Sequence, residues 1–185
     1  MRVIAGKARS LKLKTPGGEH TSPTTDRIKE TLFNILQNDV PGSVFLDLYA
    51  GSGGIGIEAI SRGARKAYFI ENAPAAITCI GQNISFTKFT EKAVILKQDA
   101  VTGLSLVRES HVDIVFLDPP YGEGQDRRVL QALRAMPYID EETLIIVEEK
   151  LDADFSYVSE MGYSIQKEKR YKTNKHMFLR REEKE

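Results

Sequence analysis

The chain has few of the residues that build disulfides or metal sites. It contains one cysteine, Cys79, and three histidines among 185 residues. A single cysteine excludes an internal disulfide framework and a cysteine-based zinc site. The histidines at positions 20, 111 and 176 are far apart in the sequence and lack partners at the spacing of metal ligands. We therefore expect no bound metal ion.

Long hydrophobic runs are also missing. No apolar run approaches the roughly 18 residues of a membrane span, and the first 14 residues lack the apolar core of a secretory signal peptide. We therefore expect a cytoplasmic protein that does not contact a membrane. Hydrophobic residues make up 41% and charged residues 28% of the chain, which is typical of a globular protein. A chain of this length predicts one main domain, and we expect a monomer.

The chain has no net charge, because 26 lysines and arginines balance 26 acidic residues. The basic residues nevertheless gather toward the two ends. The first 18 residues hold five basic residues and no acid, and residues 167–181 hold seven basic residues against Glu168 alone. Such ends could meet a polyanion on one face. Lysines that protect exposed edge strands from aggregation would give the same pattern, so charge alone leaves both interpretations open.

A segment rich in glycine, proline, serine and threonine, residues 15–25, divides the chain. Before it, residues 1–14 alternate weakly between apolar and basic side chains, which predicts a small β-hairpin. We therefore expect a basic N-terminal hairpin with its linker over residues 1–22 and the main domain over residues 23–185.

The main domain alternates between strand and helix patterns. Helical spacing of apolar residues, with Thr24 or Thr25 as the first cap, predicts helices over residues 26–37, 54–61, 74–87, 100–108, 126–136 and 152–161. Short apolar runs predict strands over residues 44–49, 67–71, 93–97, 112–117, 143–148, 163–171 and 175–181. Alternating strands and helices form a mostly parallel sheet covered on both faces. Because the turn 172–174 is too short for a parallel crossover, the last two strands must be antiparallel. The predicted fold is α/β, a doubly wound seven-stranded sheet with one antiparallel strand near its edge.

A glycine-rich turn, residues 47–56 (DLYAGSGGIG), follows the first predicted strand. In such a sheet a ligand binds outside the carboxyl ends of the strands, and glycines there let the backbone approach it closely. Asp47 offers a carboxylate that could accept hydrogen bonds from an ammonium group. Glu71 lies twenty residues after Gly51, at the end of the second strand, where it could accept hydrogen bonds from both ribose hydroxyls of a nucleoside.

Two other interpretations of this turn must be weighed. Gly51, Gly53 and Gly56 match the G-x-G-x-x-G pattern of NAD-binding enzymes. The Asp47 carboxylate would repel a pyrophosphate, however, and the chain leaves no room for a second substrate domain. Alternatively, the glycines only form a tight connection between strand and helix. Glu71 at the end of the second strand favours a ligand site over this purely structural role.

Asp99 follows the third predicted strand and precedes the helix that begins at Ala100. At that edge of the sheet its carboxylate could accept a hydrogen bond from an adenine amine. An aspartate in this position is also a common helix N-cap. The two roles are compatible, because the side chain can cap the helix while neighbouring backbone groups line a pocket.

The most specific motif is Asp118-Pro119-Pro120-Tyr121, directly after the apolar strand 112–117. The prolines stiffen the backbone and leave carbonyl acceptors without neighbouring donors. Two acceptors and an aromatic plane suit the exocyclic amine of a flipped-out base. An ordinary turn at the end of a strand is the alternative.

Together these residues carry a family resemblance. The glycine turn, Glu71, Asp99 and residues 118–121 resemble the class I methyltransferases, which use S-adenosylmethionine to methylate an exocyclic amine. The segments 1–6 (MRVIAG) and 23–33 (PTTDRIKETLF) further resemble the bacterial 16S ribosomal RNA guanine-N2 methyltransferase family. The chain departs from the family at Ser22, where the family usually has arginine.

The resemblance implies a Rossmann-like class I methyltransferase domain over residues 23–185 and an enzyme that methylates the N2 amine of a guanine, the one at position 966, in 16S ribosomal RNA. Its substrate would be the free RNA or a small-subunit assembly particle. The catalytic residues would be Asp118, Pro119 through its carbonyl, and Tyr121. The residues that bind S-adenosylmethionine would be Asp47, Ala50, Gly51, Gly53, Glu71, Asn72, Asp99 and Ala100. RNA would contact Arg2, Lys7, Arg9, Lys12 and Arg27.

Two other functions share these motifs. A DNA adenine-N6 methyltransferase uses the same Asp-Pro-Pro-Tyr turn, although such enzymes usually carry an added target-recognition region. A non-catalytic RNA-binding module could also have kept the methyltransferase fold.

Overall fold

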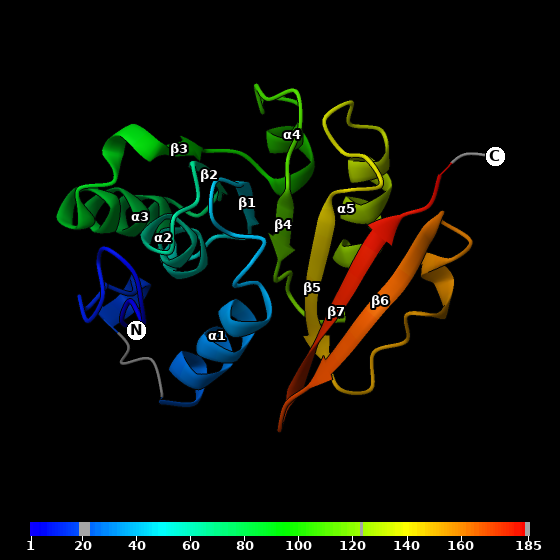
Figure 1. Cartoon of the computed structure of the whole chain (residues 1–185), viewed down its shortest axis with the longest axis horizontal. Coiled ribbons are helices and arrows are strands. Elements are labelled where there is room, and N and C mark those ends of the chain that lie inside the picture. Colours follow the sequence, from blue (N-terminus) through cyan, green and yellow to red (C-terminus); the bar gives the residue numbers. More distant parts are fainter. Residues whose placement is uncertain (19–22, 123, 184–185) are drawn as a thin grey trace.

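The computed structural model describes residues 1–18, 23–122 and 124–183. Within them, seven strands form one sheet in the order β3-β2-β1-β4-β5-β7-β6. Figure 1 shows this sheet running through the molecule, with β6 at its outer edge. The strands are β1 (Val44–Leu48), β2 (Lys66–Ile70), β3 (Ala93–Leu96), β4 (Ile114–Leu117), β5 (Leu144–Lys150), β6 (Tyr163–Arg170) and β7 (Asn174–Arg181).

The strand directions confirm the predicted fold class. Strands β1 to β5 pair in parallel, whereas β7 pairs antiparallel with both β5 and β6. The one antiparallel strand therefore lies between β5 and the edge strand β6. Parallel pairing brings the carboxyl ends of β1 to β5 to the same edge of the sheet.

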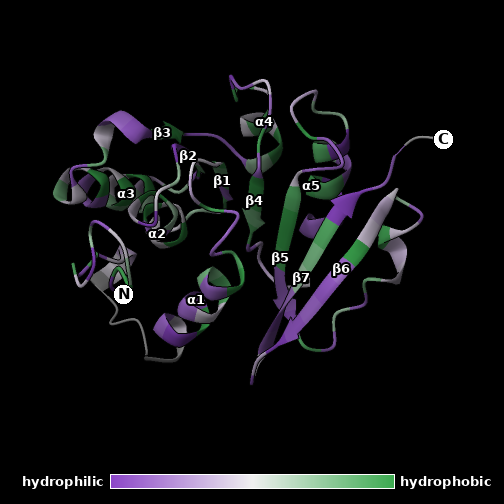
Figure 2. Ribbon diagram, viewed as in Figure 1, coloured by the Kyte–Doolittle hydropathy of each residue, from purple (hydrophilic) through white to green (hydrophobic). Residues whose placement is uncertain are grey.

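Two hydrophobic cores cover the two faces of the sheet. Val44, Leu46 and Leu48 of β1 join the core beneath α4 (Ala100–Leu104) and α5 (Gln125–Arg134). Phe45 joins the opposite core, which includes side chains of α1 (Pro23–Ile35), α2 (Gly54–Ser61) and α3 (Pro74–Thr87). The central strands are apolar throughout because both of their faces are buried. The edge strand β6 differs from the central strands. Figure 2 shows that β4 is hydrophobic, whereas the lower half of β6 is hydrophilic.

Most predicted helix boundaries agree with the structure within a few residues, and α2 and α3 agree at both ends. The predicted cap of the first helix is wrong. Helix α1 begins at Pro23, so Thr24 and Thr25 lie inside it. Proline suits the first turn of a helix because its missing N–H would have no partner there.

The helix predicted over residues 152–161 is also wrong, because this connection contains only a short 3-10 turn, η3 (Ser156–Val158). The Asp154 carboxylate accepts hydrogen bonds from both the N–H and the hydroxyl of Ser156. The Lys175 ammonium donates to the Ala153 carbonyl, which an α-helix would need for its own ladder. Local side-chain bonds of this kind compete with helix formation.

The N-terminal segment forms a short version of the predicted hairpin. An antiparallel bridge joins Arg2 to Lys12, with backbone hydrogen bonds from Val3 N–H to the Leu11 carbonyl at 2.9 Å and from Leu13 N–H to the Met1 carbonyl at 3.0 Å. Val3, Ala8 and Leu13 are buried in the core beside α1 and α2. The predicted domain boundary after residue 22 and Ser22 itself lie outside the described residues. No helix of the described residues is long and apolar enough to cross a membrane.

Glu58 of α2 holds the N-terminal segment in place. Its carboxylate is fully buried and accepts hydrogen bonds from the backbone N–H groups of Ile4 and Ala5 at 2.8 and 3.1 Å. It also lies 2.7 Å from the Arg62 guanidinium and 3.5 Å from the ammonium of Lys29, which is itself 2% exposed. Burial of that ammonium lowers the pKa of Lys29, because a charged lysine is poorly solvated there.

We predict that Glu58→Ala lowers the free energy of unfolding by about 3–5 kcal/mol, because it leaves the buried Lys29 charge without its partner. Urea denaturation followed by circular dichroism measures the change. Glu30→Ala, at an exposed position of α1, is the matched control and should stay within about 0.5 kcal/mol of the wild type. Equal losses for the two variants would contradict the anchoring role of Glu58.

Candidate active site

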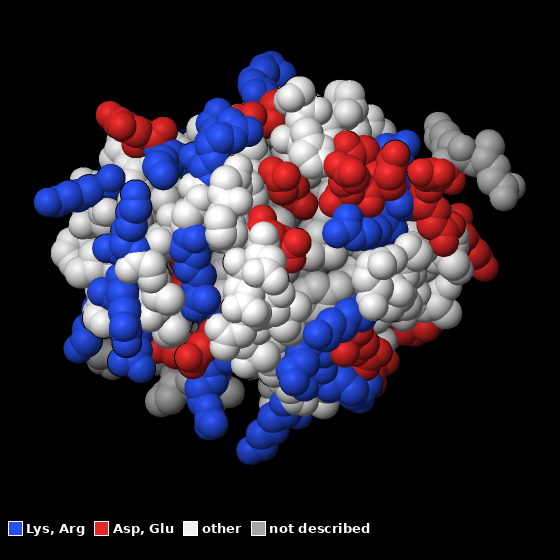
Figure 3. Space-filling model, viewed as in Figure 1, with Lys and Arg blue, Asp and Glu red and all other residues white. Residues whose placement is uncertain are grey.

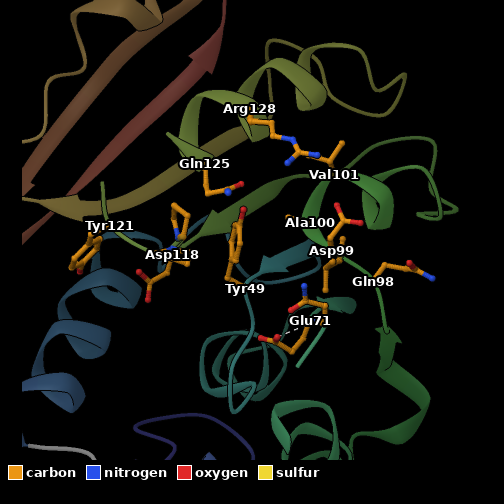
Figure 4. Close-up of a pocket in the computed structure, with 14 residues that line it drawn as sticks. Tyr49, Glu71, Gln98, Asp99, Ala100, Val101, Asp118, Tyr121, Gln125 and Arg128 are labelled. Atoms are coloured by element: carbon orange, nitrogen blue, oxygen red, sulfur yellow. Dashed lines mark hydrogen bonds between the residues drawn. The ribbon is translucent and has the colours of Figure 1, made fainter. Parts of the chain in front are cut away.

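A pocket of about 690 Å³ opens at the carboxyl edge of the parallel strands. This volume lies within the range of small-molecule sites. Its walls come from the segments that follow four strands, together with the first turns of α5. Figure 4 shows Tyr49 standing between Glu71 on one side and Asp118 on the other. The lining residues are Tyr49, Ile70–Asn72, Gln98–Val101, Asp118–Tyr121, Gln125 and Arg128.

The glycine turn forms one border of this pocket. Gly51 has a positive φ of 56°, and no neighbouring atom lies within 4 Å of the position that a Cβ would take. Gly56 differs, because a Cβ there would lie 2.4 Å from the Phe69 ring. Gly56 is therefore required for packing, whereas Gly51 leaves its surroundings open for another molecule.

Asp47 is 2% exposed and accepts a hydrogen bond from the Gly56 N–H at 2.9 Å. Burial raises the pKa of Asp47 well above its usual value, and the Asp118 and Glu71 carboxylates raise it further. In a dinucleotide site the pyrophosphate sits at the N-terminus of this helix. In this structure the Asp47 carboxylate already accepts from the N–H of Gly56, the third glycine of the pattern. A negative side chain at the helix N-terminus argues against a bound pyrophosphate and therefore against the NAD interpretation.

Glu71 closes the turn from the end of β2. One carboxylate oxygen accepts from the Gly51 N–H at 2.9 Å, and the other accepts from the Asn72 and Ala73 N–H groups, both at 2.9 Å. A carboxylate has about four acceptor positions. Three are occupied, so one position remains for a hydroxyl group in the pocket.

Asp99 performs the capping role that the sequence left open. Its carboxylate accepts from the Thr102 N–H at 3.1 Å at the start of α4, and the residue also lines the pocket. Hydrogen bonds from Thr102 lower the pKa of Asp99, so this carboxylate stays ionised over a wide pH range.

Asp118 differs from the other carboxylates at this edge. Asp47, Glu71, Asp99 and Glu148 all accept hydrogen bonds, but none of the described residues donates one to Asp118. Asp118 is exposed to solvent and lines the pocket. Desolvation, followed by repulsion from Glu148 and Glu149, raises the pKa of Asp118 to about 8. Asp118 therefore has all of its acceptor positions left for a ligand.

A polar cluster that the sequence analysis missed lies behind Tyr121. The Glu148 carboxylate accepts from the Asn174 amide at 2.7 Å, lies 2.8 Å from Nε2 of His176, and accepts from the Tyr121 hydroxyl at 3.5 Å. Tyr171 completes the cluster, with its hydroxyl 3.0 Å from Nδ1 of His176. Only the pairing of β7 with β5 brings these residues together, so no local sequence pattern predicts the cluster.

Two pocket residues of α5 were also missed. Gln125 and Arg128 lie in the first turns of this helix, and Figure 4 shows Arg128 reaching toward Val101 and Asp99. A glutamine and an arginine on a polar helix give no signal of their own, because such residues usually face solvent.

The structure gathers seven of the predicted site residues in the pocket lining: Glu71, Asn72, Asp99, Ala100, Asp118, Pro119 and Tyr121. Asp47, Ala50, Gly51 and Gly53 belong to the adjoining glycine turn. The five predicted RNA contacts, Arg2, Lys7, Arg9, Lys12 and Arg27, are all exposed. Among them, Arg2 forms an ion pair with Asp26 at 3.4 Å.

The two histidines among the described residues have structural partners. His111 bonds the Asp140 carboxylate at 2.8 Å, His176 belongs to the cluster above, and His20 lies outside the described residues. The residues that the structure describes contain no group of three or more histidine, cysteine or acidic side chains that could hold a metal ion.

Comparison with known proteins gives a consistent result. The family model described as "Conserved hypothetical protein 95" matches residues 1–180. The "Putative rRNA methyltransferase YlbH" of Bacillus subtilis is 37% identical over 150 residues, which cover 80% of this chain and 82% of that protein. "Ribosomal RNA small subunit methyltransferase D" of Escherichia coli is 34% identical over 169 residues, which cover 91% and 84%. A solved structure, "Putative methyltransferase yhhF from Escherichia coli", superposes with a TM-score of 0.84 at 32% identity and covers 100% of this chain and 99% of that one.

The raised pKa of Asp118 predicts a pH-dependent cost to stability. A carboxylate whose pKa is higher in the folded than in the unfolded protein destabilises the fold as pH rises between those two values. The stability of Asp118→Asn relative to the wild type should therefore rise between pH 3.8 and about pH 8 and stay constant above that, as measured by urea denaturation at each pH. If the free energy of unfolding of the two proteins changes equally with pH over this range, the raised pKa of Asp118 is contradicted.

Proposed function

This chain belongs to the family described as conserved hypothetical protein 95, and we propose that it transfers a methyl group from S-adenosylmethionine to the exocyclic N2 amine of a guanine in 16S ribosomal RNA. Its relatives support methyl transfer to ribosomal RNA of the small subunit, because that activity is in their names and the similarity spans most of both chains. The observation that carries the proposal is the shared pocket, in which Asp118–Tyr121 faces the same space as Glu71 and Asp99.

The residues of the pocket fit S-adenosylmethionine. Glu71 keeps one acceptor position for a ribose hydroxyl, and Asp99 and Ala100 border the part of the pocket suited to an adenine ring. The open space beside Gly51 suits the methionine end. When bound, the cofactor supplies an electrophilic methyl group on a sulfonium, which needs no prior activation by the protein.

The protein's own contribution is to position the amine. The Asp118 carboxylate and the Pro119 carbonyl would accept the two N–H groups of the guanine amine, and the Tyr121 ring would stack on the base. Holding the reacting atoms in line can lower the barrier by several kcal/mol. Because its raised pKa makes Asp118 a stronger base than an ordinary aspartate, it is also suited to take the proton that the amine loses.

The finer assignment follows the family resemblance. We propose guanine 966 as the target and the free RNA or a small-subunit assembly particle as the substrate. The exposed basic residues of the N-terminal segment and Arg27 would contact RNA phosphates. A monomer acting in the cytoplasm is sufficient for this reaction, because the pocket is formed within one chain.

Removing the Glu71 carboxylate should weaken cofactor binding. Glu71→Ala loses a hydrogen bond from the cofactor to a charged acceptor and frees the Gly51 N–H, so affinity should fall roughly 10- to 100-fold. Isothermal titration calorimetry with S-adenosylmethionine measures this, with Glu91→Ala, a carboxylate of the short turn η2 (Thr90–Lys92), as the control. Wild-type affinity in Glu71→Ala would remove Glu71 from the proposed site.

Removing the Asp118 carboxylate should abolish turnover while cofactor binding persists. Loss of a positioned base and acceptor typically costs about 10²- to 10⁴-fold in rate. Cells without the gene, complemented with wild type or Asp118→Ala, are compared by mass spectrometry of nucleosides from 16S ribosomal RNA.

Only the wild type should restore N2-methylguanosine. Restoration by Asp118→Ala would exclude the proposed role of Asp118. An unchanged N2-methylguanosine content in cells without the gene would exclude the guanine reaction, and a loss of N6-methyladenine from DNA would favour the DNA methyltransferase instead.

A further inference from the structure

The turn between β6 and β7 lies beside the proposed catalytic residues. The pairing of β5 with β7 places Lys150 opposite Asn174 and Glu148 opposite His176. Because β7 runs antiparallel to β5, it begins where β5 ends, at the edge that carries Asp118. Residues 169–174, called the hairpin tip below, therefore lie at the same edge of the sheet as the pocket residues Asp118–Tyr121, and Glu148 links Tyr121 of the pocket to Asn174 of the tip.

The hairpin tip is held firmly in this position. Asn174 and His176, which are 5% and 1% exposed, both bond the Glu148 carboxylate that accepts from Tyr121. The Tyr171 N–H donates to the Asn174 carbonyl at 2.9 Å, and the Tyr171 hydroxyl lies 3.0 Å from His176. A turn held in this way loses little further backbone freedom when its side chains bind a ligand.

The charge of this turn is positive. Lys169, Arg170 and Lys172 lie within it, and Lys150 approaches it from β5, with its ammonium 3.7 Å from the position that a Cβ on Gly122 would take. Arg170 pairs with Glu168 at 2.7 Å, whereas no carboxylate among the described residues pairs with the three lysines. Figure 3 shows Lys and Arg side chains gathered over the lower ends of β6 and β7.

A base held against Asp118 and Tyr121 has a phosphate on each side of its sugar, so the RNA must leave the pocket across its borders. Glu71 and Asp99 place carboxylates on the cofactor side of the pocket, whereas the Glu148 carboxylate on the other side is already bonded by Asn174 and His176. The hairpin tip offers unpaired cations on the other side. Protection of an edge strand from aggregation would account for Lys167 on β6. It does not account for Lys150, which belongs to the inner strand β5, or for Lys172, which lies in the turn between β6 and β7.

We propose that Lys150 and Lys172, beside and within the hairpin tip, bind backbone phosphates of the RNA next to the methylated nucleotide. This inference rests on the proposed function. It adds a second RNA-binding surface, formed by the C-terminal hairpin, to the N-terminal residues predicted from the sequence.

The test compares two double variants that remove equal charge. Lys150→Gln/Lys172→Gln alters the proposed surface, and Lys92→Gln/Lys167→Gln is the matched control on η2 and in the middle of β6. Binding to 16S ribosomal RNA is measured as a function of salt concentration. Each phosphate contact that is lost lowers the slope of log affinity against log salt by about 0.7–0.9, and kcat and the cofactor affinity should remain unchanged.

For Lys150→Gln/Lys172→Gln, we expect the slope to fall by about 1.4–1.8 and the KM for RNA to rise several-fold, while the control matches the wild type. Equal behaviour of the two double variants would overturn the proposal and leave the proposed function intact. A wild-type protein that neither binds nor methylates the RNA would overturn the proposed function and this inference with it.

Discussion

The site depends on the parallel pairing of the central strands, which brings separated parts of the chain to one edge. Leu48, Ile70 and Leu117 are the last residues of β1, β2 and β4, and the pairing register aligns Leu48 with both of the others. The segments that follow them carry the glycine turn, Glu71 and Asp118. A shift of register by one residue would turn the buried side chains of a strand to its opposite face, so the same pairing that fills the two cores also aligns the site.

Because the strand ends meet at one edge, several carboxylates lie close together there. Hydrogen bonds stabilise most of these negative charges. Backbone N–H groups of Gly56, Gly51 and Thr102 satisfy three of the carboxylates, and Asn174 satisfies the Glu148 carboxylate. Asp118 receives no such bond within the described residues, and desolvation together with repulsion from Glu148 and Glu149 raises its pKa. Polar groups that are left unsatisfied at a concave site are often the functional ones, because a substrate completes their hydrogen bonding.

The sequence was most informative where local patterns determine structure. Apolar runs located the strands, and their carboxyl ends correctly placed Glu71, Asp99 and Asp118 around one pocket. It was least informative where distant contacts decide. The connection 152–161 contains a 3-10 turn instead of an α-helix, and the ammonium of Lys175, which belongs to the distant strand β7, donates a hydrogen bond to its Ala153 carbonyl. The cluster of Glu148 and His176 exists only because β7 inserts between β5 and β6. The hairpin pattern of the N-terminal segment likewise gave no sign that this segment binds the buried Glu58 of α2.

The central claim is that a methyl donor and an amine acceptor meet at this single edge of the sheet. A crystal structure of the protein with S-adenosylhomocysteine bound tests it most directly. The account predicts the adenine beside Asp99 and Ala100, the ribose on Glu71, and the sulfur facing the space between Tyr121 and Asp118. A ligand bound outside this pocket, or one whose sulfur faces away from Asp118, would contradict it.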